Sequence, residues 1–106
     1  MEELQQQEWK DKFDQTKGAV LLDVRRPDEW EEGIIPGAMM INLMDTQAFV
    51  EEVEKLDKSK AYFIYCRSGN RSGQACRFMS QQGFTEVYNL LGGMLDWKGE
   101  VGPPIM

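Results

Sequence analysis

The sequence predicts an α/β fold with a mainly parallel β-sheet, on two observations. Three short and nearly continuous apolar segments, at residues 19–24, 61–66 and 86–91, have the composition of strands buried on both faces. Segments with the apolar spacing of helices alternate with them, and this order is typical of parallel sheets. The chain has 106 residues, the length of one domain, so we expect a single domain over residues 1–106.

The helices are predicted from the spacing of apolar residues and from proline and glycine. A helix over residues 3–15 places Leu4, Trp9 and Phe13 roughly on one side. A proline-initiated helical segment is expected over residues 26–33, ended by Gly33. The later predicted helices are an amphipathic one over residues 45–58, one over residues 72–82 that ends before Gly83, and a short one over residues 92–99.

The predicted strands place one cysteine at the edge of the sheet. The segments AVLLDV, AYFIYC and EVYNLL are the apolar strands, and MMINL, at residues 39–43, is a further candidate after the turn that IIPGA forces. Ligands of open α/β sheets bind at the carboxyl ends of strands. Cys66 ends a central-looking strand directly before a helix, so it is the first candidate for a functional residue.

Composition excludes several kinds of catalytic site. The chain has no histidine and only two cysteines. A Ser-His-Asp triad, a Cys-His pair, an HExxH metal site and a four-cysteine zinc site are therefore impossible within it. We expect no metal and no cofactor, and we expect both cysteines to be free thiols.

Net charge and hydropathy limit the partners and the location. The net charge of −6 argues against nucleic-acid binding. No apolar stretch approaches the roughly 20 residues that cross a bilayer. The acidic, glutamine-rich N-terminus does not resemble a secretory signal. We therefore expect a cytoplasmic protein that binds neither nucleic acid nor membrane.

The segment after Cys66 has the composition of an anion cradle. No acidic residue occurs between Asp57 and Glu86, although that stretch contains five bases, which suggests a small anionic substrate. Gly69 permits a tight curl, and a loop curled in this way points successive N–H groups inward, in front of the next helix. The predicted cradle comprises Arg67, Ser68, Gly69, Asn70, Arg71 and Ser72.

The same cradle is expected to acidify the Cys66 thiol. A helix N-terminus and arginines can lower a cysteine pKa from about 8.5 to about 3.5–7.5, so no histidine is needed as a base. The competing interpretation is a buried, inert cysteine at a strand end. For Cys76 that interpretation is the preferred one, because this residue lies at the margin of an apolar helix stripe; a resolving thiol is the alternative.

Three segments, in order, resemble the rhodanese family of sulfurtransferases over nearly the whole chain. LLDVRRPDEWEEGIIPGAMMINL is similar to the family's amino-terminal signature, YCRSGNRS to its active-site loop, and VYNLLGGMLDW to its carboxyl-terminal segment. The resemblance implies a five-stranded parallel sheet with helices on both faces. It also implies that Cys66 accepts a sulfane sulfur and becomes a persulfide, and that the loop holds the donor anion.

The resemblance also suggests substrates and supporting residues. A loop as charged as this one is similar to those of members that prefer thiosulfate. The acceptor of the sulfur would be a small thiol, cyanide or a protein cysteine. Asp23 and Arg25 match positions near the base of the loop and are expected to brace it. Ile34 departs from the family, because the customary residue there is histidine.

Three other functions stay open from the sequence. A sulfur carrier that relays sulfur to another protein would share the same chemistry, and a non-catalytic rhodanese-like module would bind a partner. A cysteine phosphatase or arsenate reductase would use a Cys-x5-Arg loop, whereas Cys66 and Arg71 enclose four residues. The true acceptor and the oligomeric state are not predicted.

Overall fold

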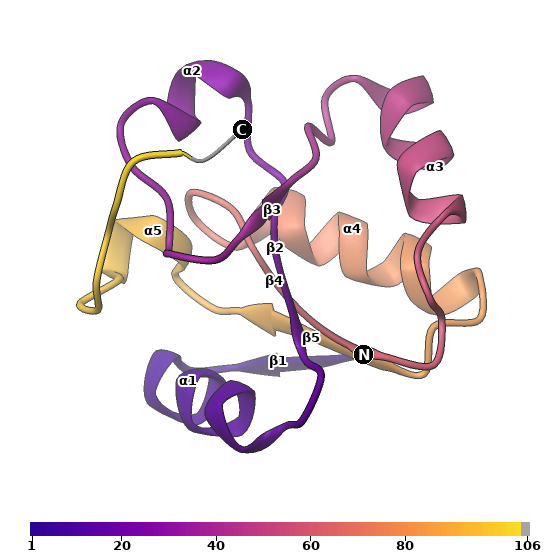
Figure 1. The fold of residues 1–106 in the computed structure, drawn as a ribbon, viewed down its shortest axis with the longest axis horizontal. Coiled ribbons are helices and arrows are strands. Elements are labelled where there is room, and N and C mark those ends of the chain that lie inside the picture. Colours follow the sequence, from indigo (N-terminus) through magenta and orange to yellow (C-terminus); the bar gives the residue numbers. More distant parts are fainter. Residues whose placement is uncertain (105–106) are drawn as a thin grey trace.

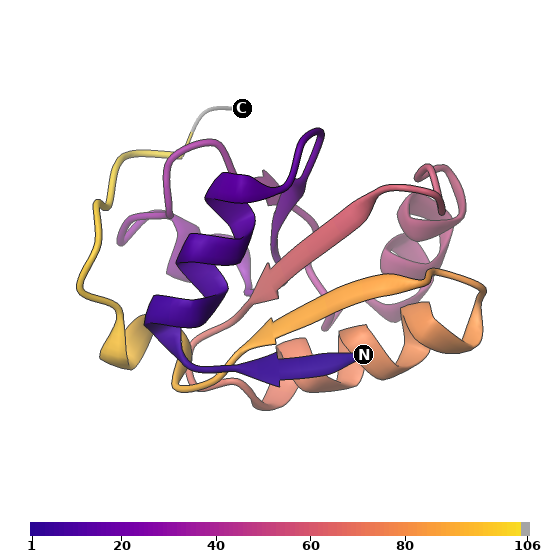
Figure 2. The same ribbon diagram turned by 90° about the horizontal axis from the view of Figure 1, so that it is seen from below.

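Within residues 1–104, which the computed structural model describes, five strands form one sheet in the order β1-β5-β4-β2-β3, and each neighbouring pair is parallel (Figures 1 and 2). The predicted α/β class is confirmed, and the sheet is parallel throughout. In chain order the elements are β1 (Glu2–Leu4), α1 (Gln6–Gln15), β2 (Val20–Asp23), α2 (Pro27–Trp30), β3 (Met39–Met40), α3 (Thr46–Glu54), β4 (Ala61–Tyr65), α4 (Asn70–Gln81), β5 (Glu86–Leu90) and α5 (Gly93–Asp96).

Helices cover both faces of the sheet, as the family resemblance implied. Successive residues of β4 point to opposite faces: Ile64 belongs to the core cluster that contains Phe49 of α3 and Met79 of α4. Phe63 belongs to the cluster on the other face, where its ring lies 5.9 Å from that of Trp9 on α1. Figure 2 shows α1 crossing the sheet on the side opposite α4. Because β4 is buried on both sides, it reads as a continuous apolar run.

The prediction of a helix from residue 3 is wrong at its start. Glu2–Leu4 form the edge strand β1, and α1 begins at Gln6. Leu4 lies opposite Leu90 of β5 and is buried. Pairing with a strand more than 80 residues later in the chain determines the structure of these three residues, and no local pattern reports such pairing.

Other element boundaries also differ from the prediction. Strand β3 has two residues rather than five, and α3 ends at Glu54. α4 begins two residues earlier than predicted, at Asn70, because Gly69 has φ +104° and ends the loop. Gly83 takes the predicted place after α4, with φ +100°. The early start matters for the site, since it places Arg71 in the first turn of α4.

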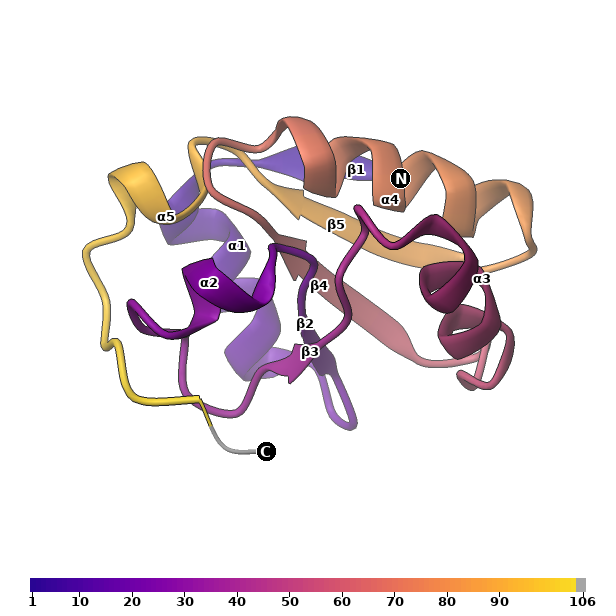
Figure 3. The same cartoon turned by 90° about the horizontal axis from the view of Figure 1, so that it is seen from above.

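The carboxyl edge of the sheet collects the elements that carry the candidate residues. Seen from above, α2, α5 and the start of α4 lie around the ends of the central strands (Figure 3). Val24 follows β2 and donates its N–H to the carbonyl of Tyr65, the last residue of β4. The segments that hold Asp23 and Cys66 are therefore adjacent. No helix in the described part of the chain has the length and apolar character to span a bilayer.

Replacing Leu4 tests the contribution of β1 to stability. We expect Leu4→Ala to lower the free energy of unfolding by about 2–4 kcal/mol, because it removes buried methyl groups and leaves a cavity in the core. The matched control is Glu2→Ala on the same strand, where the side chain is exposed and the change should stay within about 0.5 kcal/mol. Urea unfolding measures both values. Equal effects of the two substitutions would contradict the role of β1.

Candidate active site

Cys66 follows β4 directly, and residues 66–69 form a short loop before α4. Gly69 adopts φ +104° at the start of the helix. A Cβ atom there would lie 3.4 Å from the carbonyl oxygen of Leu90 and 3.5 Å from the amide nitrogen of Gly92. The positive φ and the close backbone together favour glycine at this position. The predicted curl of the loop is therefore present in the structure.

The sulfur of Cys66 lies among hydrogen-bond donors. The Gly69 N–H donates to Sγ over 3.1 Å, and the Ser72 hydroxyl oxygen lies 3.3 Å from it. Burial alone raises the pKa of this thiol, but bonds from Ser72 and from the main-chain N–H groups of Gly69 and Ser68 outweigh that effect and lower the pKa below its ordinary value. Main-chain amides and a hydroxyl thus supply the stabilisation that the sequence analysis attributed partly to arginines.

Helix α5 holds the loop in this orientation from behind. The Met94 N–H donates to the carbonyl of Cys66, and the Leu95 N–H donates to that of Arg67, each over 3.0 Å. Gly93 has φ +52°, and a Cβ there would lie 2.5 Å from the Cys66 carbonyl oxygen. With these carbonyls turned toward α5, the following amides are free to face the sulfur. The segment that resembled the family's Gly-Gly motif therefore backs the active-site loop.

Arg71 makes a bidentate ion pair with Glu29, a residue that sequence reasoning did not single out. Its guanidinium donates to the two carboxylate oxygens over 2.6 and 2.8 Å. Glu29 also accepts the Arg26 N–H in the capping box of α2. The Arg71 guanidinium, together with this backbone bond, lowers the pKa of Glu29 to about 2 against the opposing effect of burial. The pair fastens α2 to the first turn of α4.

The other predicted loop residues lie at the surface. Arg67, Ser68 and Asn70 are exposed. A hollow of about 450 Å³ beside the loop is lined by three arginines and three carboxylates, namely Arg26, Asp28, Glu29, Glu32, Arg67 and Arg71. We call this hollow the mouth of the site. Its charges are balanced, whereas the sequence suggested a locally cationic segment. Among residues 1–104, Arg67 is the lining arginine outside any ion pair.

Asp23 and Arg25 form a buried pair at the end of β2. The Arg25 guanidinium donates to Asp23 and, over 2.7 Å, to the carbonyl of Gly33. The indole N–H of Trp30 also donates to Asp23. The Arg25 guanidinium lies 5.7 Å from the ring centre of Tyr65, which directly precedes Cys66. The pair thus fixes the turn between β2 and α2 and packs on the residue before the loop. Within the described part of the chain, its hydrogen bonds do not reach residues 66–72.

Ile34 and Cys76 have plain structural surroundings. Ile34, at the position where the family usually has histidine, is buried and forms two 2.8 Å backbone hydrogen bonds with Gly102. Cys76 is fully buried in the core cluster beneath α4, and this burial raises the pKa of its thiol to about 12. Both observations favour packing roles over chemical ones.

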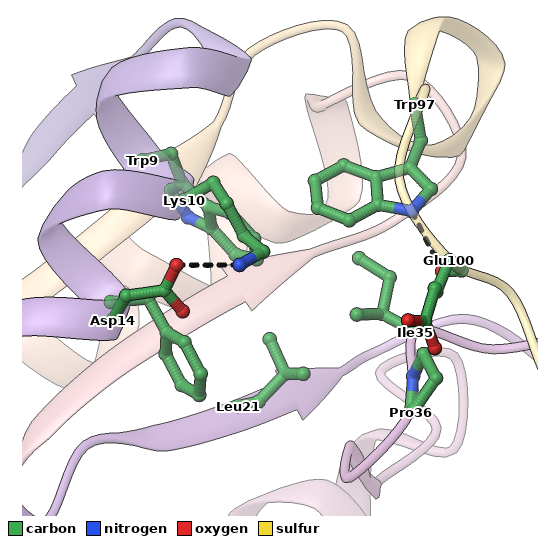
Figure 4. A pocket seen from close by; sticks show the side chains of 9 residues that line it. Trp9, Lys10, Asp14, Leu21, Ile35, Pro36, Trp97 and Glu100 are labelled. Atoms are coloured by element: carbon green, nitrogen blue, oxygen red, sulfur yellow. Dashed lines mark hydrogen bonds and ion pairs between the residues drawn. The ribbon is translucent and has the colours of Figure 1, made fainter.

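A second hollow lies on the α1 face of the sheet, away from residues 66–72. It has a volume of about 240 Å³, and Figure 4 shows Trp9 and Trp97 above Leu21 and Ile35, with the Lys10–Asp14 ion pair at one side. Trp9 is almost fully buried and packs edge-on against Trp97 at 5.9 Å. The two tryptophans therefore contribute to the core on this face of the sheet.

Comparisons with known proteins identify the family. The rhodanese-like domain family matches residues 4–100. The chain is 43% identical over 94 residues to the putative sulfurtransferase YtwF of Bacillus subtilis, which covers 89% of this chain and 87% of that protein. It is 39% identical over 79 residues to the thiosulfate sulfurtransferase GlpE of Coxiella burnetii, covering 74% and 71%. The chain therefore belongs to the rhodanese-like sulfurtransferase family, and the resemblance is confirmed.

A solved structure supports the same assignment. The crystal structure of a rhodanese-like domain protein from Staphylococcus aureus is similar over 99% of this chain and 100% of that chain, with a TM-score of 0.83 and 29% sequence identity. The similarity extends over the whole sheet and its helices, so the fold is that of the family.

The pH dependence of stability tests the Glu29–Arg71 pair. The folded-state pKa of Glu29, about 2, lies below its ordinary value of 4.5, so the pair stabilises the protein above about pH 4.5 and its contribution is lost as the pH falls toward 2. We expect Glu29→Gln to cost on the order of 3 kcal/mol near neutral pH. The cost should shrink steadily in acid. Urea unfolding at several pH values measures it.

Asp28→Asn is the matched control for this substitution. Asp28 is the neighbouring carboxylate, and it pairs with Arg26 in an exposed geometry, where solvent screening leaves an ion pair little effect on stability. If Glu29→Gln cost no more than Asp28→Asn, or if its cost did not change with pH, the pair would not fasten α2 to α4.

Proposed function

We propose that this protein, acting as one rhodanese-like domain, is a thiosulfate sulfurtransferase that carries sulfur on Cys66. The observation that carries the proposal is the position of Sγ, 3.1 Å from the Gly69 N–H and 3.3 Å from the Ser72 oxygen, in surroundings that lower the thiol pKa. A thiolate is the reactive form of cysteine, and preorganised donors stabilise the anions that form on it.

The first step of the proposed reaction loads sulfur onto the protein. The Cys66 thiolate attacks the outer sulfur of thiosulfate and forms a new S–S bond. The bond between the two sulfur atoms of thiosulfate breaks, and its electron pair leaves with sulfite. The product is a Cys66 persulfide with its negative charge on the outer sulfur. N–H groups from Ser68, Gly69 and the first turn of α4, including Asn70, support this charge.

The second step returns the thiolate. A small thiol, cyanide or a protein cysteine attacks the outer sulfur as a nucleophile, and the pair of electrons in the S–S bond returns to Cys66. The two steps balance without a metal, a redox cofactor or a general base, and they give ping-pong kinetics. Asp23 and Arg25 serve this reaction by holding the backbone around Tyr65, and the Ser72 hydroxyl lies within reach of the sulfur when it is ionised.

Access to the sulfur requires movement. Cys66 has no solvent-exposed area, so thiosulfate can reach Sγ only when side chains at the mouth shift. Arg67 is exposed there and carries a forked set of donors suited to an oxyanion. Arg71, held by Glu29, positions the helix start. We therefore assign the first contact with the sulfonate end of the donor to Arg67.

Transfer of one sulfur atom can be observed directly by intact-protein mass spectrometry. Incubation with thiosulfate should add the mass of one sulfur to the protein, and a reductant should remove it. Cys66→Ser should abolish this gain and reduce turnover to the uncatalysed background, because the hydroxyl cannot replace the thiolate as the sulfur carrier. Circular dichroism should show that the variant is folded.

Cys76→Ala is the matched control for this experiment. Since Cys76 is buried and its thiol has a pKa raised to about 12, the variant should still gain one sulfur. Gain of sulfur by Cys66→Ser, or no gain by the native protein, would overturn the proposal. Hydrolysis of a phosphate ester or reduction of arsenate instead would assign the site to the rival enzyme class.

Arg67→Gln tests recognition of the donor. We expect the KM for thiosulfate to rise about tenfold, because one charge-assisted contact is lost, while kcat changes little. The control is a small organic persulfide as donor, which lacks the sulfonate group and should react equally well with both proteins. An unchanged KM for thiosulfate would place the anion contact elsewhere.

A further inference from the structure

The hydroxyl of Ser72 lies between two groups that can both accept its proton. Its oxygen is 2.5 Å from Oδ1 of Asn89 and 3.3 Å from Sγ of Cys66. A serine hydroxyl has a single proton to donate. All three residues are fully buried, so water does not supply a substitute. The two acceptors therefore compete for one hydrogen bond.

The orientation of the Asn89 amide is determined by its other partners. Its NH₂ group donates to the carboxylate of Glu3 on β1 over 3.0 Å and to the carbonyl of Gly69 over 3.1 Å. Both partners are acceptors, so the nitrogen must face them and Oδ1 must face Ser72. A carbonyl oxygen cannot donate. The short contact therefore requires the Ser72 proton to point toward Asn89.

This arrangement suits a neutral Cys66 and opposes an ionised one. While the thiol is protonated, its S–H can point at the lone pairs of Ser72, whose own proton remains on Asn89. Ionisation makes the sulfur the stronger acceptor, and the hydroxyl must then turn away from Asn89 to reach it. That rotation leaves the buried Oδ1 of Asn89 without its donor, which carries a free-energy cost.

We propose that Asn89 is a positioning residue that acts through Ser72: it withholds the hydroxyl proton from Cys66 and thereby disfavours a negative charge on Sγ. The second consequence rests on the proposed function. In a persulfide the charge lies on the outer sulfur, so the Ser72 proton can return to Asn89. Asn89 therefore favours the sulfur-loaded protein over the free thiolate.

The other titratable groups around the loop do not take part in this competition. They come from β1, β2 and the turn after it, α2, the end of β4, the loop itself and α4. Arg67 of the loop is exposed and, in the described part of the chain, outside any ion pair. Arg71 and Glu29 bond to each other, as do Arg25 and Asp23, and burial raises the pKa of both Cys76 and Tyr65. Glu3 contacts Asn89 from the exposed side of β1. A substitution at position 89 removes one hydrogen bond that the exposed Glu3 accepts and changes none of the other groups directly.

Asn89→Leu is the test, in a Cys76→Ala background so that a single thiol titrates. Leucine has the same number of side-chain heavy atoms as asparagine, with the same branching at Cγ, and it has no acceptor. The carbonyl of Gly69 still accepts a 3.0 Å hydrogen bond from the Gly73 N–H, so it is not left without a partner in the variant. We expect the pKa of Cys66 to fall by about one unit, a tenfold change in the ionisation constant. The ultraviolet absorbance of the thiolate measures it, with Cys66→Ser as the blank.

Ser72→Ala is the control that separates an effect through the hydroxyl from a general structural effect of the substitution at position 89. Without the hydroxyl the two acceptors are no longer linked, so Asn89→Leu should leave the pKa of Cys66 unchanged in the Ser72→Ala background. Glu3→Gln should also leave it unchanged, because glutamine keeps an oxygen for the Asn89 amide. Asn89→Ala is a second variant with the same expectation, should the leucine variant fail to fold.

The outcomes separate this proposal from the proposed function. A Cys66 pKa that rises or stays constant in both Asn89 variants, or that shifts equally with and without Ser72, would overturn the role of Asn89. At a fixed ratio of thiosulfate to sulfite, Asn89→Leu should reduce the persulfide fraction severalfold. A native protein that forms no persulfide at all would refute the function and leave the pKa result standing.

Discussion

Two hydrogen bonds from α5 fix the orientation of the backbone that follows β4, and the surroundings of the Cys66 sulfur depend on that orientation. The N–H groups of Met94 and Leu95 bind the carbonyls of Cys66 and Arg67. Because a peptide group is planar, turning its carbonyl outward turns the N–H of the next residue the opposite way. The Ser68 N–H, which follows the carbonyl of Arg67, is one of the main-chain groups that lower the pKa of Cys66, together with the Gly69 N–H beside it. Gly93 is needed for this contact, since a side chain there would collide with the loop.

The groups that stabilise charge at the sulfur differ from those at the mouth of the site. Fixed dipoles and one hydroxyl act on Sγ, whereas full charges lie further out and neutralise one another. Arg71 is held by Glu29 and cannot approach the sulfur without breaking a half-buried ion pair. A bare guanidinium next to Cys66 would stabilise a thiolate so strongly that the thiolate would become a weak nucleophile. Amides lower the pKa more moderately, and they do so without adding a group that must itself be neutralised.

The sequence was sufficient where a local pattern decides the structure. The apolar strand that ends at Cys66, the curl at Gly69 and the helix end at Gly83 each depend on a few neighbouring residues, and all three were predicted. Family resemblance supplied the number of strands, whereas the contact of Gly93 and α5 with the loop was found only in the structure. Neither Glu29 nor Asn89 was found. Glu29 lies 42 positions from Arg71 and is one of several acids in its segment, so spacing alone could not select it.

Asn89 was missed for a different reason. It sits in the middle of an otherwise apolar strand, EVYNLL, and a polar residue at a position buried on both faces is itself a signal, because burial without a partner is costly. The prediction for this segment was a strand without a functional residue. The error at β1 has the opposite origin, since Glu2–Leu4 carry no strand pattern and take that structure from β5 and the sheet as a whole.

The chain has no histidine, and hydrogen bonds to the sulfur make one unnecessary. A histidine base would titrate near neutral pH and would add its own charge change to that of the thiol. In the described part of the chain, the partners of the loop titrate far from neutrality, as Glu29 does at about 2 and Cys76 at about 12. The lowered pKa of Cys66 then results from the hydrogen bonds of its surroundings and not from a neighbouring base. The ionisation of the sulfur depends on the amides of the loop and on the single proton that Ser72 can give either to Cys66 or to Asn89.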